Sequence, residues 1–263
     1  MPRVVALYRY PVKGFTPEPC TALTVLPEGR VAGDRVLAFR FANAPVADDQ
    51  WCRKYEGIVL ANTPELARLT AQFDHRELRL KIALGSQVLA EEKLDDAGRA
   101  RLVEALTAYV LSVREHPLRY HPDRLPLKLV GDGVAPRYQD NEAGQVTLHS
   151  RETIASAAAA LRDPNLSEYR FRHNIVIEGV EAWEEQTWLG RGIRIGDVEF
   201  DVVKPKVRCL ATHANPVTGE RDLQVMQQLM RAFAQKEPVL GVGMLTRGAG
   251  SEVRTGDSVS MIA

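Results

Sequence analysis

Residues 192–209, which read GIRIGDVEFDVVKPKVRC, contain the clearest structural pattern in this chain. Apolar side chains alternate with polar ones on both sides of the two-residue turn Gly196-Asp197, and this pattern predicts a β-hairpin. Pro205 interrupts the second arm, which ends at Cys209 directly after the cation Arg208. The segment therefore predicts a thiol beside positive charge at the end of a β-strand.

Strand patterns recur along the rest of the chain, whereas helical patterns are few. Apolar and partly alternating runs predict strands at 4–10, 35–41, 78–82, 146–149, 174–178 and 258–262. Helical spacing of apolar residues predicts helices at 98–115, at 151–162 and around 223–233. These elements predict a mainly β fold with a few helices (α+β) and a barrel or sandwich core.

A less ordered stretch rich in proline and glycine separates two parts of the chain. It contains Pro117, Pro122, Pro126, Gly131, Gly133 and Pro136. We interpret it as a connector, because such residues punctuate regular structure. The predicted division is an N-terminal part at 1–115 and a C-terminal part at 116–263.

Composition excludes several classes of function. The 263 residues include 34 basic and 34 acidic side chains, so no overall field favours nucleic acid or an anionic membrane. Basic residues interleaved with stacking aromatics are absent, and no apolar run is long enough to span a bilayer. We therefore expect neither nucleic acid nor membrane among the partners.

The three cysteines, Cys20, Cys52 and Cys209, lie far apart and form no C-x-x-C pair. This spacing does not support a zinc ribbon or a cysteine-ligated iron–sulfur cluster. A sparse, odd set of cysteines is typical of a reducing compartment, and the N-terminus lacks the pattern of a secretory signal. The expected location is cytoplasmic.

Cys209 permits several readings when it is considered alone. A buried, inert thiol is the commonest case, but a thiolate beside Arg208 could attack an electrophile or bind a soft metal. A cysteine hydrolase would pair it with His213 or His149. A zinc site built on Cys209 and His213 lacks a second pair of ligands.

Three cations stand where predicted strands meet loops, which is a common position for ligand-binding residues. Lys13 follows Tyr10-Pro11-Val12, Arg35 follows Gly33-Asp34, and Arg172 follows Phe171. Lysine and arginine at such places can hold a phosphate group. Each could also be a solvated surface residue or part of an ion pair, so the set is more informative than any member.

Five short motifs, taken together and in this order, resemble those of the MOSC-domain proteins. They are Tyr10-Pro11-Val12-Lys13, Gly33-Asp34-Arg35, Phe171-Arg172-His173-Asn174, Ala182-Trp183-Glu184-Glu185, and the Cys209 segment that ends in Asn215-Pro216-Val217-Thr218-Gly219. The similarity is greatest to the two-part branch of the family. That branch includes the mitochondrial amidoxime-reducing components and their bacterial relatives.

The resemblance implies an N-terminal β-barrel-like domain packed on a C-terminal MOSC β-barrel domain. It also implies a molybdenum cofactor, that is, molybdopterin with molybdenum. By position, Cys209 would be the catalytic residue and would supply a thiolate to the metal. The cofactor-binding residues that the resemblance implies are Lys13, Arg35, His149, Ser150, Arg172, Asn174 and Arg208.

The activity implied by the resemblance is a molybdenum-dependent oxidoreductase that reduces N-hydroxylated or other N-oxygenated small molecules. The chain has no flavin motif and too few cysteines for a cluster, so a separate flavin or iron–sulfur reductase would supply electrons. The alternative is a non-catalytic module that carries the cofactor or sulfur. Three positions depart from the family pattern. Gly14 replaces a common serine, Asn215 replaces a common aspartate, and Lys206 replaces a common cysteine, which leaves one sulfur in that segment.

Overall fold

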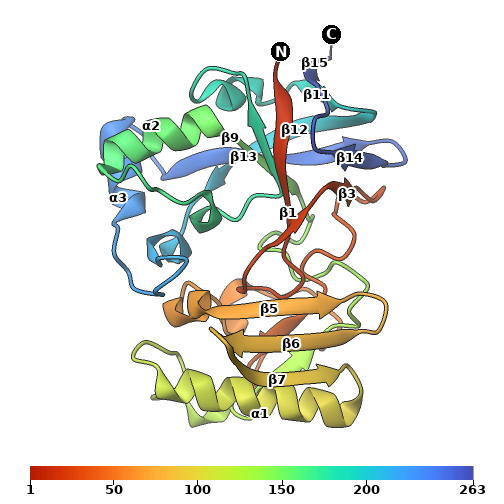
Figure 1. Cartoon of the computed structure of the whole chain (residues 1–263), viewed down its shortest axis with the longest axis vertical. Helices are drawn as coiled ribbons and strands as arrows, with labels where there is room; N and C mark the ends of the chain where they lie inside the picture. The colour runs from red at the N-terminus through yellow and green to blue at the C-terminus, as the bar shows by residue number, and fades with distance from the viewer. Residues whose placement is uncertain (263) are drawn as a thin grey trace.

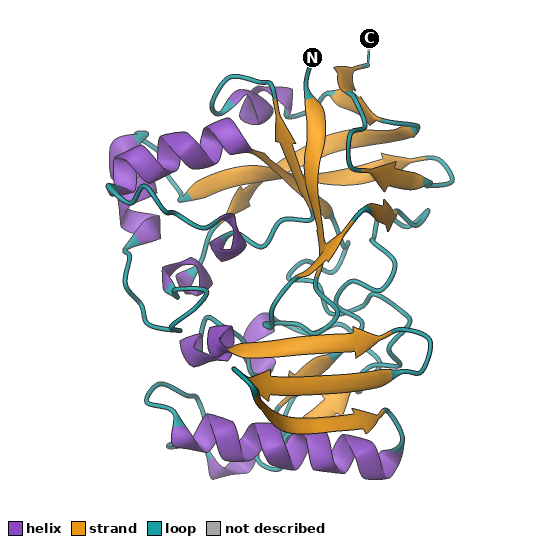
Figure 2. Ribbon diagram, viewed as in Figure 1, coloured by secondary structure: helices purple, strands orange, loops and turns teal. Residues whose placement is uncertain are grey.

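The fold is mainly β with a few helices, as the sequence predicts, and the computed structural model describes residues 1–262. Figures 1 and 2 show two lobes, one above the other, with strands in both. The upper lobe contains one large sheet, and the lower lobe contains smaller sheets covered by a long helix. The chain termini lie together at the top of the upper lobe (Figure 1).

Eight strands form the large sheet of the upper lobe. They are β1 (Arg3–Arg9), β2 (Glu18–Cys20), β9 (Val146–Ser150), β10 (Ile175–Glu178), β11 (Gly192–Ile195), β12 (Val198–Val207), β13 (Val239–Arg247) and β15 (Val259–Met261). Their order is β15-β11-β12-β13-β9-β10-β1-β2. The predicted hairpin is confirmed, because β11 pairs antiparallel with β12 about the Gly196-Asp197 turn.

The large sheet curls around its core but is not a closed barrel in the part of the chain that the structure describes. Its edge strands β15 and β2 do not pair with each other. However, the Val4 amide donates to the Asp257 carbonyl and the Val259 amide donates to the Pro2 carbonyl, both at 2.9 Å. These bonds join the start of β1 to the segment that enters β15, so the two ends of the chain approach each other, but within residues 1–262 the sheet does not form the closed barrel that the resemblance implies.

Two helices cover one side of the upper lobe, as Figure 2 shows. These are α2 (Arg151–Leu161) and α3 (Val225–Ala232), which pack together around Ala157, Leu229 and Leu240. The remaining short pair of strands in this lobe is β3 (Ala22–Thr24) with β14 (Glu252–Arg254).

The lower lobe has its own apolar core. It consists of β4 (Ala38–Arg40), β5 (Leu69–Asp74), β6 (Arg79–Leu84), β7 (Gln87–Lys93), α1 (Asp96–Ser112) and β8 (Lys128–Val130). Asp95 caps α1 by accepting a hydrogen bond from the Gly98 amide at 2.7 Å, which satisfies a free donor of the first turn. Leu102 and Leu106 on the predicted apolar face of α1 are fully buried against the sheet.

Short 3-10 helices occupy the connections and shape the region between the lobes. They are η1 (Lys54–Glu56), η2 (Pro64–Arg68), η3 (Pro122–Arg124), η4 (Glu168–Arg170), η5 (Glu184–Trp188) and η6 (Leu210–His213). Strand β1 belongs to the upper sheet, although it begins the chain, and β8 pairs with β4 of the lower lobe. The division at residue 115 into two independent domains stays a prediction. No helix within residues 1–262 is both long and apolar enough to cross a membrane.

Candidate functional site

Cys209 lies just beyond the end of β12, where the strand departs from regular geometry. The pairing of β12 with β13 shifts register twice, between Val202 and Lys204 and again between Pro205 and Val207. Such irregularities bend a strand and re-aim the residues that follow. The Cys209 carbonyl then accepts bonds from the Thr212 amide and hydroxyl, both at 2.9 Å, which starts the η6 turn. The partly buried thiol is thereby held between the lobes.

Cys209 lines a cavity of about 70 Å³ whose walls are strongly cationic. Five of the lining side chains are cations and one is a carboxylate, Asp140. The charged residues around the thiol are Arg35, Asp140, Arg170, Arg172, Lys206 and Arg208. A smaller cavity of about 50 Å³ adjoins it and adds Lys13 and Lys54. The predicted cations Lys13, Arg35, Arg172 and Arg208 thus converge on Cys209.

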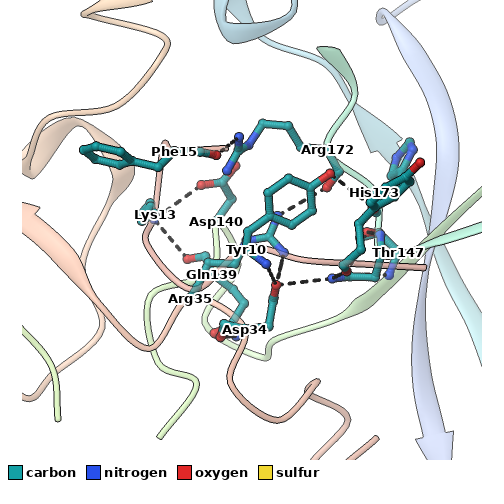
Figure 3. A network of polar contacts seen from close by, with 12 residues as sticks. Tyr10, Lys13, Phe15, Asp34, Arg35, Gln139, Asp140, Thr147, Arg172 and His173 are labelled. Carbon is teal, nitrogen blue, oxygen red and sulfur yellow. Dashed lines mark hydrogen bonds and ion pairs between the residues drawn. The ribbon is translucent and has the colours of Figure 1, made fainter. Parts of the chain in front are cut away.

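Asp140 is the anion at the centre of this cation cluster. Its carboxylate lies 3.3 Å from the Lys13 ammonium, which also donates to the Gln139 carbonyl at 3.2 Å (Figure 3). Although desolvation opposes ionisation, the charges of Lys13, Lys54 and Arg35 hold the pKa of Asp140 far below its usual range. The carboxylate therefore stays ionised and partly neutralises the cluster.

Lys54 brings a positive charge directly to the thiol. Burial opposes protonation of its amine, but attraction to the Cys209 sulfur and to Asp140 raises the pKa of Lys54. On the other side of the cavity, burial and then repulsion by Arg208 lower the pKa of Lys206 to about 8. The site thus holds one lysine that stays charged beside the sulfur and one that loses its charge in mildly alkaline solution.

Two arginines are fixed against the ring of Tyr10, as Figure 3 shows. The guanidinium carbons of Arg35 and Arg172 each lie 4.4 Å from the centre of that ring. Arg35 is paired with Asp34 at 2.6 Å, whereas Arg172 donates to the Phe15 carbonyl at 2.6 Å. Burial lowers the pKa of Arg172 to about 10, so it remains charged at neutral pH while holding the two lobes together.

A chain of hydrogen bonds through two buried histidines holds Arg208 in place. Arg208 Nη1 lies 2.9 Å from His173 Nε2, and His173 Nδ1 lies 2.8 Å from His149 Nδ1. Burial lowers the pKa of both histidines, so both are neutral.

The donors and acceptors in this chain fix both tautomers. Arginine only donates, so His173 Nε2 accepts and His173 Nδ1 carries the proton. His149 Nδ1 must then accept, and the proton of His149 sits on Nε2, 3.8 Å from the Glu168 carboxylate. Arg208 is consequently anchored by a directional chain of hydrogen bonds that ends at His149, whose Nε2 has no hydrogen-bond partner within residues 1–262.

Three of the predicted cofactor-binding residues do not line either cavity. Asn174 is buried and bonds to Thr147, to the Tyr8 carbonyl and to Asp34. His149 lies behind His173 in the chain described above.

Ser150 caps α2 by accepting from the Thr153 amide at 3.1 Å. It and the Thr153 hydroxyl also contact the buried Glu185 carboxylate, at 3.3 and 2.9 Å. The polar groups of Ser150 and Thr153 at the start of α2 are therefore engaged by the protein's own carboxylate.

The histidines of the hydrolase alternative are engaged elsewhere. His213 Nε2 accepts from the Met226 amide at 3.3 Å, and His149 contacts His173. Within residues 1–262, no group of three or more histidine, cysteine, aspartate or glutamate side chains is placed to hold a metal ion.

Sequence reasoning missed Lys54 and Asp140, and it noted Lys206 only as a substitute for a cysteine. Lys54 stands in a 3-10 turn and Asp140 in an irregular loop, where no periodic pattern marks a site. Their roles depend on contacts between segments that are far apart in the sequence, such as the ion pair of Lys13 with Asp140.

The sequence of this chain is similar to a known domain family and to several known proteins. The family model of the MOSC domain matches residues 135–260. The chain is 36% identical over 123 residues to the mitochondrial amidoxime-reducing component 1 of Danio rerio, a match that covers 47% of this chain and 32% of that protein. It is 38% identical over 77 residues to the molybdenum cofactor sulfurase of Homo sapiens, covering 29% of this chain and 8% of that protein.

Among solved structures, the YUAD protein from Bacillus subtilis aligns over 98% of this chain and 94% of its own. The TM-score is 0.42 and the identity is 10%, too weak to support a conclusion.

The first of these relatives shares about a third of its length with this chain, and the cysteine segment falls within the matched MOSC region. The chain therefore contains a MOSC domain and is related in sequence to the amidoxime-reducing components and the molybdenum cofactor sulfurases.

Proposed function

We propose that this chain binds a molybdenum cofactor through Cys209 and reduces N-hydroxylated or other N-oxygenated small molecules. The observation that carries the proposal is a single thiol surrounded by converging cations. Lys13, Arg35, Arg172 and Arg208 approach Cys209 from both lobes of the protein. The names of the relatives, which include amidoxime-reducing components, support the same reading.

The residues at the site fit an anionic, sulfur-liganded cofactor. A thiolate is a suitable ligand for a soft metal, and the surrounding cations suit a phosphate group. Three residues that line the cavity have a buried polar atom without a hydrogen-bond partner within residues 1–262: Gln139 Oε1, Arg170 Nε and Arg208 Nε. Buried polar atoms are normally paired, so these three fit contacts with a bound group.

Each group of residues has a distinct role in the proposed site. Cys209 would hold the metal, and Lys54 would place its positive charge beside the sulfur. Lys13 and Arg35 would hold the phosphate, in place of part of their present contacts with Asp140 and Asp34. His149 and Asn174 would not contact the cofactor but would hold neighbouring residues in position, since both are buried next to residues that line the site.

When bound, the cofactor would supply a two-electron change between Mo(IV) and Mo(VI). The overall reaction consumes two electrons and two protons, breaks the N–O bond, and releases the reduced nitrogen compound and water. The three cysteines are unpaired and far apart in sequence, so we propose that a separate flavin or iron–sulfur reductase supplies the electrons. A reducing, cytoplasmic location is consistent with that cysteine usage.

The proposal is tested by turnover. Protein purified from a cofactor-producing host is given an aryl amidoxime and a chemically reduced dye as electron donor. We expect formation of the amidine by the wild type and by the control Cys20→Ala, and none by Cys209→Ala. Bound cofactor without turnover in the wild type would contradict the reductase and favour the carrier alternative.

A further inference from the structure

A larger and chemically different cavity lies on the other side of the Cys209 loop. Its volume is about 590 Å³, within the usual range of small-molecule sites, and it is formed by segments of both lobes. We call it the apolar chamber. The apolar residues that define it are Phe15, Leu60, Ala67, Ala211, Ala214 and Val217.

The apolar chamber shares a wall with the cysteine site. Arg172 and Ala211 line the chamber and both of the cavities beside Cys209. Ala211 is two residues from the thiol, and Arg172 closes the wall by donating to the Phe15 carbonyl at 2.6 Å (Figure 3). A molecule seated in the chamber therefore has one end next to the proposed metal ligand.

The charges of the two spaces differ. The chamber is lined by two cations, Arg170 and Arg172, and by two carboxylates, Asp163 and Asp222, and Arg170 is paired with Asp222 at 2.8 Å. The cavity at Cys209 has five cations and one carboxylate. An anionic group is thus favoured at the thiol, whereas an uncharged apolar group is favoured in the chamber.

We propose that the apolar chamber is the substrate site and binds an uncharged molecule with an apolar body and one polar end. The polar, N-oxygenated end would lie at the Arg172–Ala211 wall, and the apolar body would contact Leu60, Ala67 and Ala214. The position of the polar end rests on the proposed function. The preference for an uncharged apolar body rests only on the volume, the apolar lining and the charges of the chamber.

The binding test uses cofactor-free protein, so it is separate from the test of activity. An aryl amidoxime is titrated into wild type, into Ala67→Trp, which fills the chamber, and into the control Val88→Trp. Val88 is exposed on β7 and lies outside the chamber lining. We expect saturable binding to wild type and control, and at least tenfold weaker binding to Ala67→Trp. Equal binding to all three proteins would overturn the proposal.

A second measurement needs no substitution in the chamber. With carbon-13 in the alanine methyl groups, the amidoxime should shift the resonances of Ala67, Ala211 and Ala214 in the wild type. Saturable binding that leaves these three unshifted would also overturn the proposal.

In loaded protein, Ala67→Trp should raise KM at least tenfold and leave kcat within about twofold. A kcat loss with unchanged KM would contradict a substrate site. If binding to the chamber is observed but neither loaded wild type nor control turns over, the reductase proposal fails while the binding site stands.

Discussion

Replacing Asp140 with asparagine should strengthen the binding of anions at the cation cluster. The carboxylate competes with any incoming anion for Lys13, Lys54 and Arg35, and its oxygen lies 3.3 Å from the Lys13 ammonium. Asparagine keeps the shape and removes the charge. A phosphate group could then bind these three cations without competing with a carboxylate of the protein.

The expected gain in binding free energy follows from the distance between the charges and from the exposure of the Asp140 side chain. Two unit charges 4 Å apart interact by about 1 kcal/mol in water and by about 4 kcal/mol near a protein surface. The Asp140 side chain is 62% exposed, so we weight the estimate toward water. A gain of about 1–2 kcal/mol is a roughly 5- to 30-fold tighter complex.

The assay is calorimetric titration of cofactor-free protein with pyrophosphate at low salt. Asp201→Asn is the control, because Asp201 is also about half exposed and paired with an arginine, Arg247, on a strand of the upper sheet. We expect the control to match the wild type within about twofold. Pyrophosphate binding that is unchanged or weaker in Asp140→Asn would refute the view that this carboxylate neutralises an anion site.

Three further predictions follow from the same contacts. Nitrogen-15 NMR at pH 7 should find both buried histidines neutral, His173 protonated on Nδ1 and His149 on Nε2. Lys54→Met should slow alkylation of Cys209 by iodoacetamide, because the positive charge beside the sulfur is lost. Burial raises the pKa of Glu185 in the folded protein, so its contribution to stability is greatest at low pH. That contribution is lost as pH rises from about 4.5, its unfolded value, through the higher folded one. Urea unfolding should show this loss in the wild type but not in Glu185→Gln.

Each of these has a result that would contradict it. Identical tautomers, or a charged histidine at pH 7, would disprove the directional chain behind Arg208. Lys93→Met, an exposed lysine paired with Glu77, is the control for Lys54, and equal alkylation rates in the two variants would remove Lys54 from the site. If the free energy of unfolding changes with pH in the same way in wild type and Glu185→Gln, burial does not raise the pKa of this carboxyl.

Local patterns were sufficient to predict the elements that depend on local chemistry. The hairpin around Gly196-Asp197 is confirmed, because its turn residues and its alternation are both encoded within ten residues. The helix at α2 is also confirmed, with Ser150 as its cap. Strand β13 was not predicted, since Gly241 and Gly243 interrupt its apolar pattern. These glycines lie against Leu148, His173 and Gln145, where added side-chain atoms would clash.

The candidate site shows the same division between local and long-range information. Lys13, Arg35 and Arg172 could be singled out because each cation stands at the end of a strand pattern within a short motif. Lys54 and Asp140 could not be singled out, because they acquire their roles from partners more than 80 residues away. The near closure of the large sheet also depends on contacts between the two ends of the chain.

The central claim is that Cys209 is the protein's ligand to molybdenum, and its most direct test is the metal content of purified protein. Wild type and Cys209→Ala are produced in a host that makes the cofactor, and molybdenum is measured per chain by elemental analysis. We predict close to one molybdenum per wild-type chain and loss of most of it in Cys209→Ala. Wild-type protein without molybdenum would contradict cofactor binding, and a variant that retains it fully would contradict the role of Cys209.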